Sequence, residues 1–512
     1  MNNQKGVVLI ISYMVIVVLL IFIGSFVARS ISESVVANRE RDSIKALHIA
    51  EAGIEQAIHD LTLDFIYSPG VPSFRDSRIY TSGGTSIDLT QGGGVSVPQD
   101  YDNFYEIPYG TGYCVPAVST SIGGGIFRVE LTNIPGEENE VWISSTGTYE
   151  GISKTIRTLV RAKDISPWDN VIFAGSGASG RVISGNVDIA GSVIILGDGL
   201  TENDIAVEMT GSGMVRNNYE TLPDFFLRRI PPCPTVVYNG EVVESLDAEF
   251  RVKRGKVSLS GFSTVGEPND FGDPYKDTVD GSYVTDGFTG NQGVSNVHSD
   301  NGTTHRYDLG DELSFPLLSD AYGGYNNYMD YARDRSLVVN DPVFNNVTPD
   351  SIFNFADANG SISMDGAGNM TIDGWVFLDG VDFNTKKTAN KDLITYTGKG
   401  VLVVSGNISI TTDFLTPDVP NSFPNNLIGF ITPNTVTCST AQTEVMGAFY
   451  AENEIISTKQ TIVTGSFVSN FFDMGNEVPK IFQVPSLANA LPDGFIGKGS
   501  IWIVTILSWQ EL

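Results

Sequence analysis

The sequence contains few residues of the kinds that hold metals or form disulfides. Its 512 residues include three cysteines and four histidines. Cys114, Cys233 and Cys438 are widely separated and form no CxxC motif, so one intrachain disulfide at most is expected and no zinc site is indicated. His298 and His305 lie in a polar segment at a spacing that fits no standard zinc motif. No P-loop and no GxSxG motif occurs, so we expect neither a cofactor nor an enzymatic activity.

Basic residues are also scarce. The chain has 31 Lys and Arg against 60 Asp and Glu, which gives a formal net charge of −29. By count, the first 66 residues carry only −2 of this charge, so the remainder is strongly acidic. A surface that binds phosphate backbones needs clustered Lys and Arg. The composition therefore predicts no nucleic-acid partner, and it is typical of a soluble, self-repelling exported domain.

Charge is missing altogether from residues 7–27, and proline is missing from residues 28–65. At about 1.5 Å per residue, the 21 uncharged, mostly apolar residues would span roughly 31 Å, the hydrocarbon thickness of a bilayer. We predict one helix over residues 7–66, of which the first half spans a membrane and the second half is amphipathic. The apolar stripe of the second half is expected to contain Ile44, Leu47, Ala50, Ile54, Ile58, Leu61 and Phe65.

A cleavable secretory signal does not fit this segment. Such a signal has an apolar core of about 7 to 15 residues and a small-x-small cleavage site. Here the run is longer, and Phe26 stands where the first small residue should be. Periodicity alone leaves two interpretations open, a single-pass anchor with a helical stalk and a helix that takes part in assembly.

The N-terminal residues resemble those of type IV pilin-like proteins. The similarity lies in a short polar leader ending in Lys5-Gly6, an apolar run that begins at Val7, and "ALHIAEAGIEQAI" at residues 46–58, which is similar to PilX-like minor pilins. The resemblance covers residues 1–66. It implies cleavage after Gly6 by a prepilin peptidase, leaving Val7 as a new, often methylated N-terminus of a single-pass inner-membrane protein whose bulk lies outside the cytoplasm. It also implies other pilin subunits and the inner-membrane assembly platform as partners.

One position departs from the pattern of that family. Most pilins carry a glutamate at the fifth mature residue, where it neutralises the amine of a neighbouring subunit; here that position is Ile11, and the nearest downstream carboxylate is Glu33. An unpaired buried amine is costly, so we do not expect a standard subunit of the filament shaft. A tip or initiating subunit fits, because it has no earlier neighbour's amine to neutralise. A protein that is cleaved and anchored but never polymerised fits equally.

The segment after the helix is predicted to be a small pilin-like α/β unit over residues 67–163. "IFRVELTNI" (126–134), "VWISSTGTYE" (141–150) and "ISKTIRTLVRAK" (152–163) each alternate apolar and polar residues, and turn signals separate them. This pattern predicts a three-stranded antiparallel meander. One apolar face of such a sheet needs a cover, which the second half of the N-terminal helix can supply.

The remaining residues are predicted to be a mostly β passenger, so the fold class is α+β. Short alternating bursts broken by glycine favour a parallel β-solenoid over an antiparallel sandwich. Gly429, Gly447 and Gly465 open related units at a spacing of 18 residues, as one solenoid turn would. We place a first solenoid segment at 164–215, an insertion at 216–357 and a second solenoid segment at 358–512.

The insertion contains the Tyr- and Asn-rich stretch "DAYGGYNNYMDYARD" (320–334), whose end is predicted as a short helix. Such composition occurs on carbohydrate-facing surfaces, so a surface glycan or a protein is the ligand considered, although local packing is the more ordinary explanation. Acidic clusters at 269–277 and 379–383 could hold Ca²⁺, but neither matches the EF-hand register, and we expect solvated turns there.

Taken together, the sequence predicts a minor type IV pilin-like subunit at or near a filament tip, acting in assembly, priming or adhesion. Two alternatives stay open. One is a tip pseudopilin of type II secretion. The other is a surface polysaccharide-degrading β-helix enzyme with paired carboxylates, carried on a pilin-like anchor.

Overall fold

The structure is a computed structural model, and its chain divides into two compact units. It describes residues 4–67, 78–80, 86–88, 115–116, 120–122, 124–134, 137–176, 182–183, 187–201, 203–270, 272–279, 293–300, 313–438, 440–475, 479–498 and 501–512. Unit 1 comprises Met1–Asp164 and Trp502–Leu512, and unit 2 comprises Ile165–Ile501. Each unit is described by itself below.

Unit 1 consists of one long helix and a small antiparallel sheet. Its elements are α1 (Gln4–Tyr67), β1 (Arg78–Tyr80), β2 (Ser86–Asp88), β3 (Val115–Pro116), β4 (Thr120–Ile122), β5 (Gly125–Ile134), β6 (Glu137–Tyr149), β7 (Ile152–Ile165) and β33 (Ile501–Glu511). The predicted long N-terminal helix is therefore confirmed. Of the helices in the described residues, α1 alone is long and apolar enough to cross a membrane, judged by length and composition.

The predicted antiparallel meander is also confirmed. β5 pairs with β6 from Ile126↔Thr148 onward, and β6 pairs with β7 from Glu140↔Arg161 to Tyr149↔Ile152. The end of the chain was expected to be a last strand of the second solenoid segment at 358–512, but this strand joins the sheet of unit 1: β33 lies beside β7, and Lys154 Nζ is 2.7 Å from Glu511 Oε1. The chain thus leaves this sheet after β7, builds unit 2, and returns to the same sheet.

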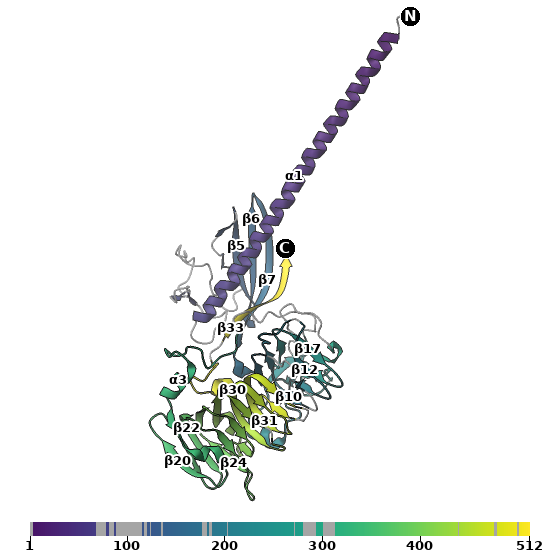
Figure 1. The fold of residues 1–512 in the computed structure, drawn as a ribbon. Helices are drawn as coiled ribbons and strands as arrows, with labels where there is room; N and C mark the ends of the chain where they lie inside the picture. The colour runs from purple at the N-terminus through teal and green to yellow at the C-terminus, as the bar shows by residue number, and fades with distance from the viewer. Residues whose placement is uncertain are drawn as a thin grey trace. The chain divides into compact units, whose positions relative to one another are not determined.

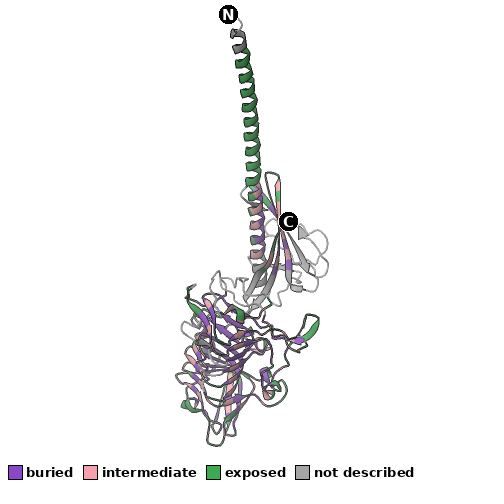
Figure 2. Cartoon of the chain, turned by 90° about the vertical axis from the view of Figure 1, so that its right-hand side faces the viewer, coloured by how far each residue is buried: buried purple, intermediate pink, exposed green. Residues whose placement is uncertain are grey.

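The second half of the helix packs on the sheet (Figures 1 and 2), and four of its six buried positions are Ala or Gly. The buried positions of α1 are Ala46, Ile49, Ala50, Gly53, Ile54 and Ala57. This face differs from the predicted stripe, because Ile44 is 56% exposed and Leu47 only half-buried, while the side chains of Leu61 and Phe65 lie outside the described residues. The reason is the close approach of the two backbones. A Cβ on Gly53 would collide with Ser145 of β6, so larger residues cannot face the sheet there.

Unit 2 is almost entirely β-structure. Its strands are β8 (Ile172–Ala174), β9 (Val182–Ile183), β10 (Asp188–Ala190), β11 (Val193–Ile195), β12 (Ile205–Met209), β13 (Met214–Arg216), β14 (Thr235–Tyr238), β15 (Glu241–Glu244), β16 (Phe250–Val252), β17 (Lys256–Leu259), β18 (Thr264–Val265), β19 (Leu337–Val339), β20 (Ile352–Ala356), β21 (Gly360–Asp365), β22 (Asn369–Leu378), β23 (Phe383–Thr385), β24 (Leu393–Thr397), β25 (Lys399–Val404), β26 (Ile408–Ile410), β27 (Asp413–Leu415), β28 (Leu427–Thr432), β29 (Thr435–Thr437), β30 (Glu444–Ile456), β31 (Ile462–Asp473) and β32 (Lys480–Phe482). Its short helices are η1 (Pro167–Asp169), α2 (Asp224–Leu227), η2 (Val294–Asn296), α3 (Tyr328–Asp334), η3 (Pro342–Asn346), α4 (Ser422–Asn425) and α5 (Leu487–Ala490).

Three parallel ladders run through unit 2. The first joins β19, β22, β25, β28, β30, β31, β8, β11 and β16 in this order. The second joins β24, β27, β30, β31, β32, β10, β13 and β18. The third joins β23, β26, β29, β30 and β31. All belong to one 20-stranded sheet, which forms a closed, mainly parallel β-barrel and confirms the mostly β passenger.

Apolar residues occupy the same position of the first ladder in every strand. The paired residues, each at most 9% exposed, are Leu337, Val376, Leu402, Phe430, Phe449, Phe467, Ile172, Val193 and Phe250. The rings of Phe430 and Phe449 stack with centroids 4.8 Å apart. Burial of one such side chain contributes about 1.5 to 3 kcal/mol, so this column is a main source of stability.

The predicted 18-residue repeat is exact at one of its two steps. Gly447 pairs with Gly465, as the spacing requires. Gly429 pairs instead with Ala448, one residue later, because the chain between β28 and β30 is one residue longer. Gly465 has φ +146°, and a Cβ there would collide with the carbonyl oxygen of Gly447, so glycine is required at this strand contact.

The region expected as an insertion takes part in the barrel. Its strands β16, β18 and β19 extend the ladders, whereas β14 and β15 form a separate antiparallel hairpin. β20 and β21 are antiparallel to one another, and β21 pairs antiparallel with β22. The ladder pairing of residues 216–357 was not anticipated, because it joins strands far apart in the sequence.

Replacing Phe449 by alanine tests the apolar column. Phe449 is fully buried between two other phenylalanines of the ladder, so Phe449→Ala should lower the free energy of unfolding by about 3 to 5 kcal/mol. The measurement is thermal unfolding of the full chain in detergent, followed by circular dichroism. Phe262→Ala is the control, because Phe262 is 86% exposed and its removal should leave the midpoint unchanged. Equal midpoints for both variants would contradict this account of the core.

Replacing Gly147 by alanine tests the contact between α1 and the sheet. A Cβ on Gly147 would collide with the backbone of α1 at Ala46 and Ala50, so overpacking should destabilise unit 1 by about 1 to 3 kcal/mol. Amide hydrogen exchange along β6 should then become faster in Gly147→Ala. Gly24→Ala is the matched control, because no atom lies within 4 Å of the added Cβ. Unchanged exchange in Gly147→Ala would show that the helix can move away from the sheet at little cost.

Candidate functional site

The N-terminal part of α1 is the first candidate site. Gly6, Val7 and Ile11 all lie in its first turns, and Ile11 is 56% exposed; the side chains of Gly6 and Val7 lie outside the described residues. From Leu9 to Ile31 every large apolar side chain is exposed (Figure 2). An apolar surface of this size needs a cover of lipid or of other apolar helices. The arrangement can therefore anchor the chain or bundle with similar helices.

No carboxylate of α1 can take the role of the missing glutamate. Glu33, the first carboxylate after Ile11, lies 22 residues further along the helix, about 33 Å away by the helical rise. It is also paired, with its Oε1 2.9 Å from Arg29 Nε.

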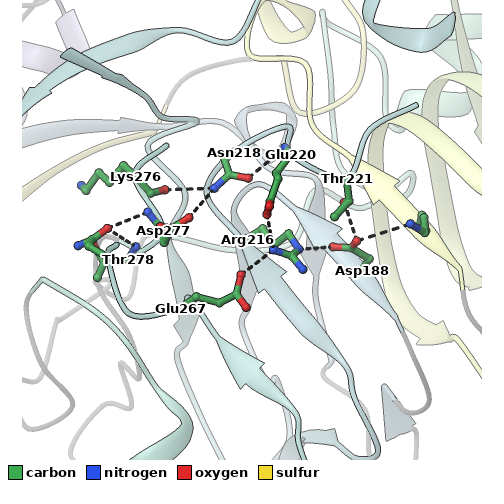
Figure 3. Close-up of polar contacts among 11 residues, drawn as sticks. Asp188, Arg216, Asn218, Glu220, Thr221, Glu267, Lys276, Asp277 and Thr278 are labelled. Carbon is green, nitrogen blue, oxygen red and sulfur yellow. Dashed lines mark hydrogen bonds and ion pairs between the residues drawn. The ribbon is translucent and has the colours of Figure 1, made fainter. Parts of the chain in front are cut away.

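A charged cluster on the second ladder of unit 2 is the second candidate (Figure 3). Arg216, at the end of β13, donates to Asp188 at 3.1 Å, to Glu220 at 3.1 Å and to Glu267 at 2.6 Å. Asp188 also accepts a hydrogen bond from Thr221, and Lys480 of β32 lies 3.8 Å from it. The side chains of Arg216 and Asp188 are only 14% and 11% exposed.

The cluster is best explained as a set of ion pairs that holds neighbouring strands together. Three carboxylates surround one guanidinium, so the positive charge is fully occupied and offers nothing to an anionic ligand. The partners come from β10, β13, β32 and the turn after β18, which are neighbours on one ladder. These ion pairs fix the register of the strands. No sequence motif reveals them, because Lys480 and Asp188 are hundreds of residues apart in the chain.

Asp277 lies at the edge of this cluster and has a perturbed pKa. Burial, and then the negative charges of Asp273, Glu267 and Glu220, raise the pKa of its carboxyl group from the ordinary 3.8 to about 6. Asn218 Nδ2 donates to Asp277 Oδ1 at 3.0 Å, which holds the carboxyl group in place. Asp277 is therefore partly protonated in weakly acidic solution.

The Tyr-rich stretch is used largely for packing. α3 forms where a short helix was expected, and Tyr328 is buried, with its hydroxyl donating to the carbonyl of Gly494 at 2.9 Å. Tyr322 contacts Tyr331 edge to face at 4.7 Å, and Tyr331 contacts Trp375 in the same way at 6.2 Å. Rings that pack on one another leave little free face for a sugar. The local packing explanation therefore accounts for this surface.

The two acidic clusters considered for Ca²⁺ have protein partners. Asp379 is bound by Arg333 at 2.6 Å, and Asp382 accepts a hydrogen bond from the backbone of Asn407 at 2.7 Å. Asn269 accepts one from the backbone of Asp277 at 2.8 Å. Within the described ranges, no group of three or more His, Cys, Asp or Glu residues is arranged to hold a metal ion.

Two of the three cysteines lie in the described residues. Cys233 and Cys438 are both buried and free, and burial raises the pKa of each thiol to about 12. Buried thiols of this kind stay protonated and are poor nucleophiles. Cys114 and His305 lie outside the described residues, while His298 donates its backbone N–H to Val265.

Replacing Asp277 by asparagine gives a test of pH dependence. The pKa of the Asp277 carboxyl group is higher in the folded than in the unfolded chain, so protonation of this group stabilises the fold. The stabilisation is complete below about pH 3.8 and is lost as the pH rises through about 6. Asp277→Asn keeps an acceptor for Asn218 but never acquires the charge. Its thermal midpoint should therefore exceed that of the native chain at about pH 8, and the difference should vanish near pH 4. Asp373→Asn, at an exposed position, is the control. A constant difference at all pH values would contradict the assignment.

Comparison with protein-family models finds no match, and comparison with curated proteins finds none either. Among solved structures, the chain is similar to the crystal structure of the competence-associated pilin ComZ from Thermus thermophilus. The TM-score is 0.50 and the sequence identity 18%, over 92% of this chain and 97% of that chain. At this identity the likeness concerns the fold. The long N-terminal apolar helix, the small antiparallel sheet and the large β-rich part together form a pilin-like fold.

Proposed function

We propose that this chain is a minor type IV pilin-like subunit that is anchored in the membrane and acts at or near the tip of a filament. The observation that carries the proposal is the division of α1. Its first half exposes a continuous apolar surface, and its second half is packed on the sheet of β5, β6 and β7. One helix is thereby suited to two environments, lipid or a helical bundle at one end and a folded exported unit at the other.

The energetics support an inserted first half. The 16 Val, Leu, Ile and Phe residues between Val7 and Val27 contribute about −0.3 to −0.6 kcal/mol each on an insertion scale. Their sum of roughly −5 to −10 kcal/mol favours the membrane over water. The proposed topology is single-pass, with the bulk of the chain outside the cytoplasm. Transfer to a filament would replace lipid by the apolar helices of other pilin subunits.

Processing and position follow from the N-terminal residues. In this proposal a prepilin peptidase cleaves after Gly6, and Val7 becomes the mature N-terminus. Ile11 then occupies the fifth position, where it offers no charge to a neighbouring amine. Burial of an unpaired amine is costly, so the subunit is best accommodated where it has no earlier neighbour, at the tip.

The passenger is proposed to be a parallel β-solenoid that acts in assembly, priming or adhesion rather than in catalysis. The support for a solenoid is that from β22 to β31 the strands of the first ladder follow one another in the chain at short steps, as the paired residues Gly374, Gly400 and Ile428 show with steps of 26 and 28 residues. The support for a binding or assembly role is that the two described thiols are buried and the charges of the Arg216 cluster are mutually paired.

Replacing Ile11 by glutamate tests the position in the filament. If the missing carboxylate keeps the chain out of the shaft, Ile11→Glu should enter sheared surface filaments at a several-fold higher ratio to the major subunit than the native chain. Ile10→Glu is the matched control, because it places the same charge one residue away from the required position.

Mass spectrometry of the same fractions reads the N-terminus. A start at Val7, especially a methylated one in sheared filaments, is the expected result. A start at Met1 confined to membranes would contradict processing. Equal incorporation of the native chain and both variants would contradict the role assigned to Ile11.

A further inference from the structure

An open pocket in unit 2 lies where three short segments meet. It has a volume of about 450 Å³, within the usual range of about 300 to 1,000 Å³ for ligand pockets. Its walls come from the chain after α2, from α4 and from α5, and it includes the prolines Pro231, Pro232 and Pro424. None of these segments belongs to the Arg216 cluster or to the Tyr-rich stretch.

The walls of the pocket are held in place from behind. Arg229 is 8% exposed and donates to the carbonyls of Thr416 at 3.1 Å and Phe225 at 2.7 Å. Its own carbonyl accepts the backbone N–H of Phe423 at 2.9 Å. These bonds tie the segment of Pro231 to α4. Because these walls are already ordered, ligand binding would cost little conformational entropy.

The polar groups of the pocket are neutral. They are the amides of Asn421, Asn425 and Asn489, three exposed residues, and no charged side chain is among the lining residues that the structure describes. Asn425 Nδ2 donates to the carbonyl of Asn421 at 2.8 Å, which leaves its Oδ1 as an acceptor. The hydroxyl oxygen of Ser486 is itself buried, so this residue contributes to the wall and not to the polar groups that a ligand can reach.

We infer that this pocket binds a neutral carbohydrate. Amide groups can both donate and accept, as the hydroxyl groups of a sugar do. The rings of Pro231 and Pro232, which are half-buried and exposed respectively, supply apolar surface for the C–H face of a pyranose, while Pro424 is buried behind them. A charged ligand would find no counter-charge in the lining, and an anionic one would also meet the strongly acidic chain.

The inference goes beyond the proposed function and does not depend on it. Binding of a sugar requires only the folded unit 2, whether or not the chain is processed or enters a filament. It would give the passenger a recognition role on neutral glycans. The binding experiment below therefore fails or succeeds independently of the Ile11 experiment.

The test uses the full chain in a zwitterionic detergent, because glycoside detergents would compete for the pocket. The probes are the methyl glycosides of glucose, galactose, mannose and N-acetylglucosamine, with methyl glucuronide as the anionic comparison. Ligand-observed saturation-transfer NMR detects binding, and titration gives the Kd. We expect at least one neutral glycoside to bind with a Kd of about 1 mM, and methyl glucuronide to bind more weakly.

Two variants and one control assign the binding to the pocket. Asn421 has φ +55°, so Asn421→Gly removes the amide without backbone strain, and Asn489→Ala removes a second amide at an exposed position. The double variant should weaken binding by about tenfold or more. Ala490→Phe should abolish it by filling the pocket while every polar group stays. Asn453→Ala, exposed elsewhere in unit 2, should bind like the native chain.

Three results would overturn the inference. One is the absence of saturation transfer to all four neutral glycosides in the native chain. Another is native affinity in both the double variant and Ala490→Phe, which would place the sugar elsewhere. The third is tighter binding of methyl glucuronide than of any neutral probe. Unchanged circular dichroism and thermal midpoints identify variants whose loss of binding is local.

Discussion

The contact between α1 and β6 is the constraint on which unit 1 depends. At Gly147 the strand meets the helix backbone directly, and at Gly53 the helix meets the side chain of Ser145. Gly53 on the helix and Gly147 on the strand allow this close approach. A methyl group added to either glycine would force the helix and the sheet apart. Because α1 continues without interruption into its exposed apolar half, the same contact also fixes that apolar half to the sheet of unit 1.

Unit 2 is stabilised in a different way. Its parallel ladders place residues of the same kind next to one another on neighbouring strands. Each apolar residue of the first ladder stacks on an apolar residue of the next strand, and the charged residues of the second ladder are paired across its edge by Arg216 and Lys480. Hydrophobic burial supplies the stability, while the ion pairs penalise a shift of register. A column of this kind tolerates turns of varying length between its strands. This explains why Gly429 can pair with Ala448, one residue after the position expected from the 18-residue repeat.

The parts of the fold that could be predicted from the sequence are those set by local patterns. The absence of proline and the apolar run define α1, and alternation with turn signals defines β5, β6 and β7. The return of β33 to β7, and the pairing of β31 with β8, could not be predicted, because they join strands that are hundreds of residues apart. The buried face of α1 was misjudged for a related reason. Helical periodicity correctly marked Ala50 and Ile54, but it also marked the exposed Ile44 and missed Ala46 and Gly53, which the close approach of the sheet selects.

The same distinction applies to the candidate sites. Gly6, Val7 and Ile11 are contiguous in sequence, so a motif can reveal them. The pocket lined by Pro231, Asn421 and Asn489 is assembled from three distant segments of neutral residues, and no motif describes it.

The order of strands in the first ladder has a consequence for how the passenger can be made. β8 and β11, from the beginning of unit 2, follow β31, from near its end, in the stack. During synthesis, the edge of β8 that pairs with β31 has no neighbour until almost the whole unit has been made. Unit 2 must therefore close late and as a whole, and a chain interrupted before β31 leaves an open parallel edge available to chaperones, proteases or other copies.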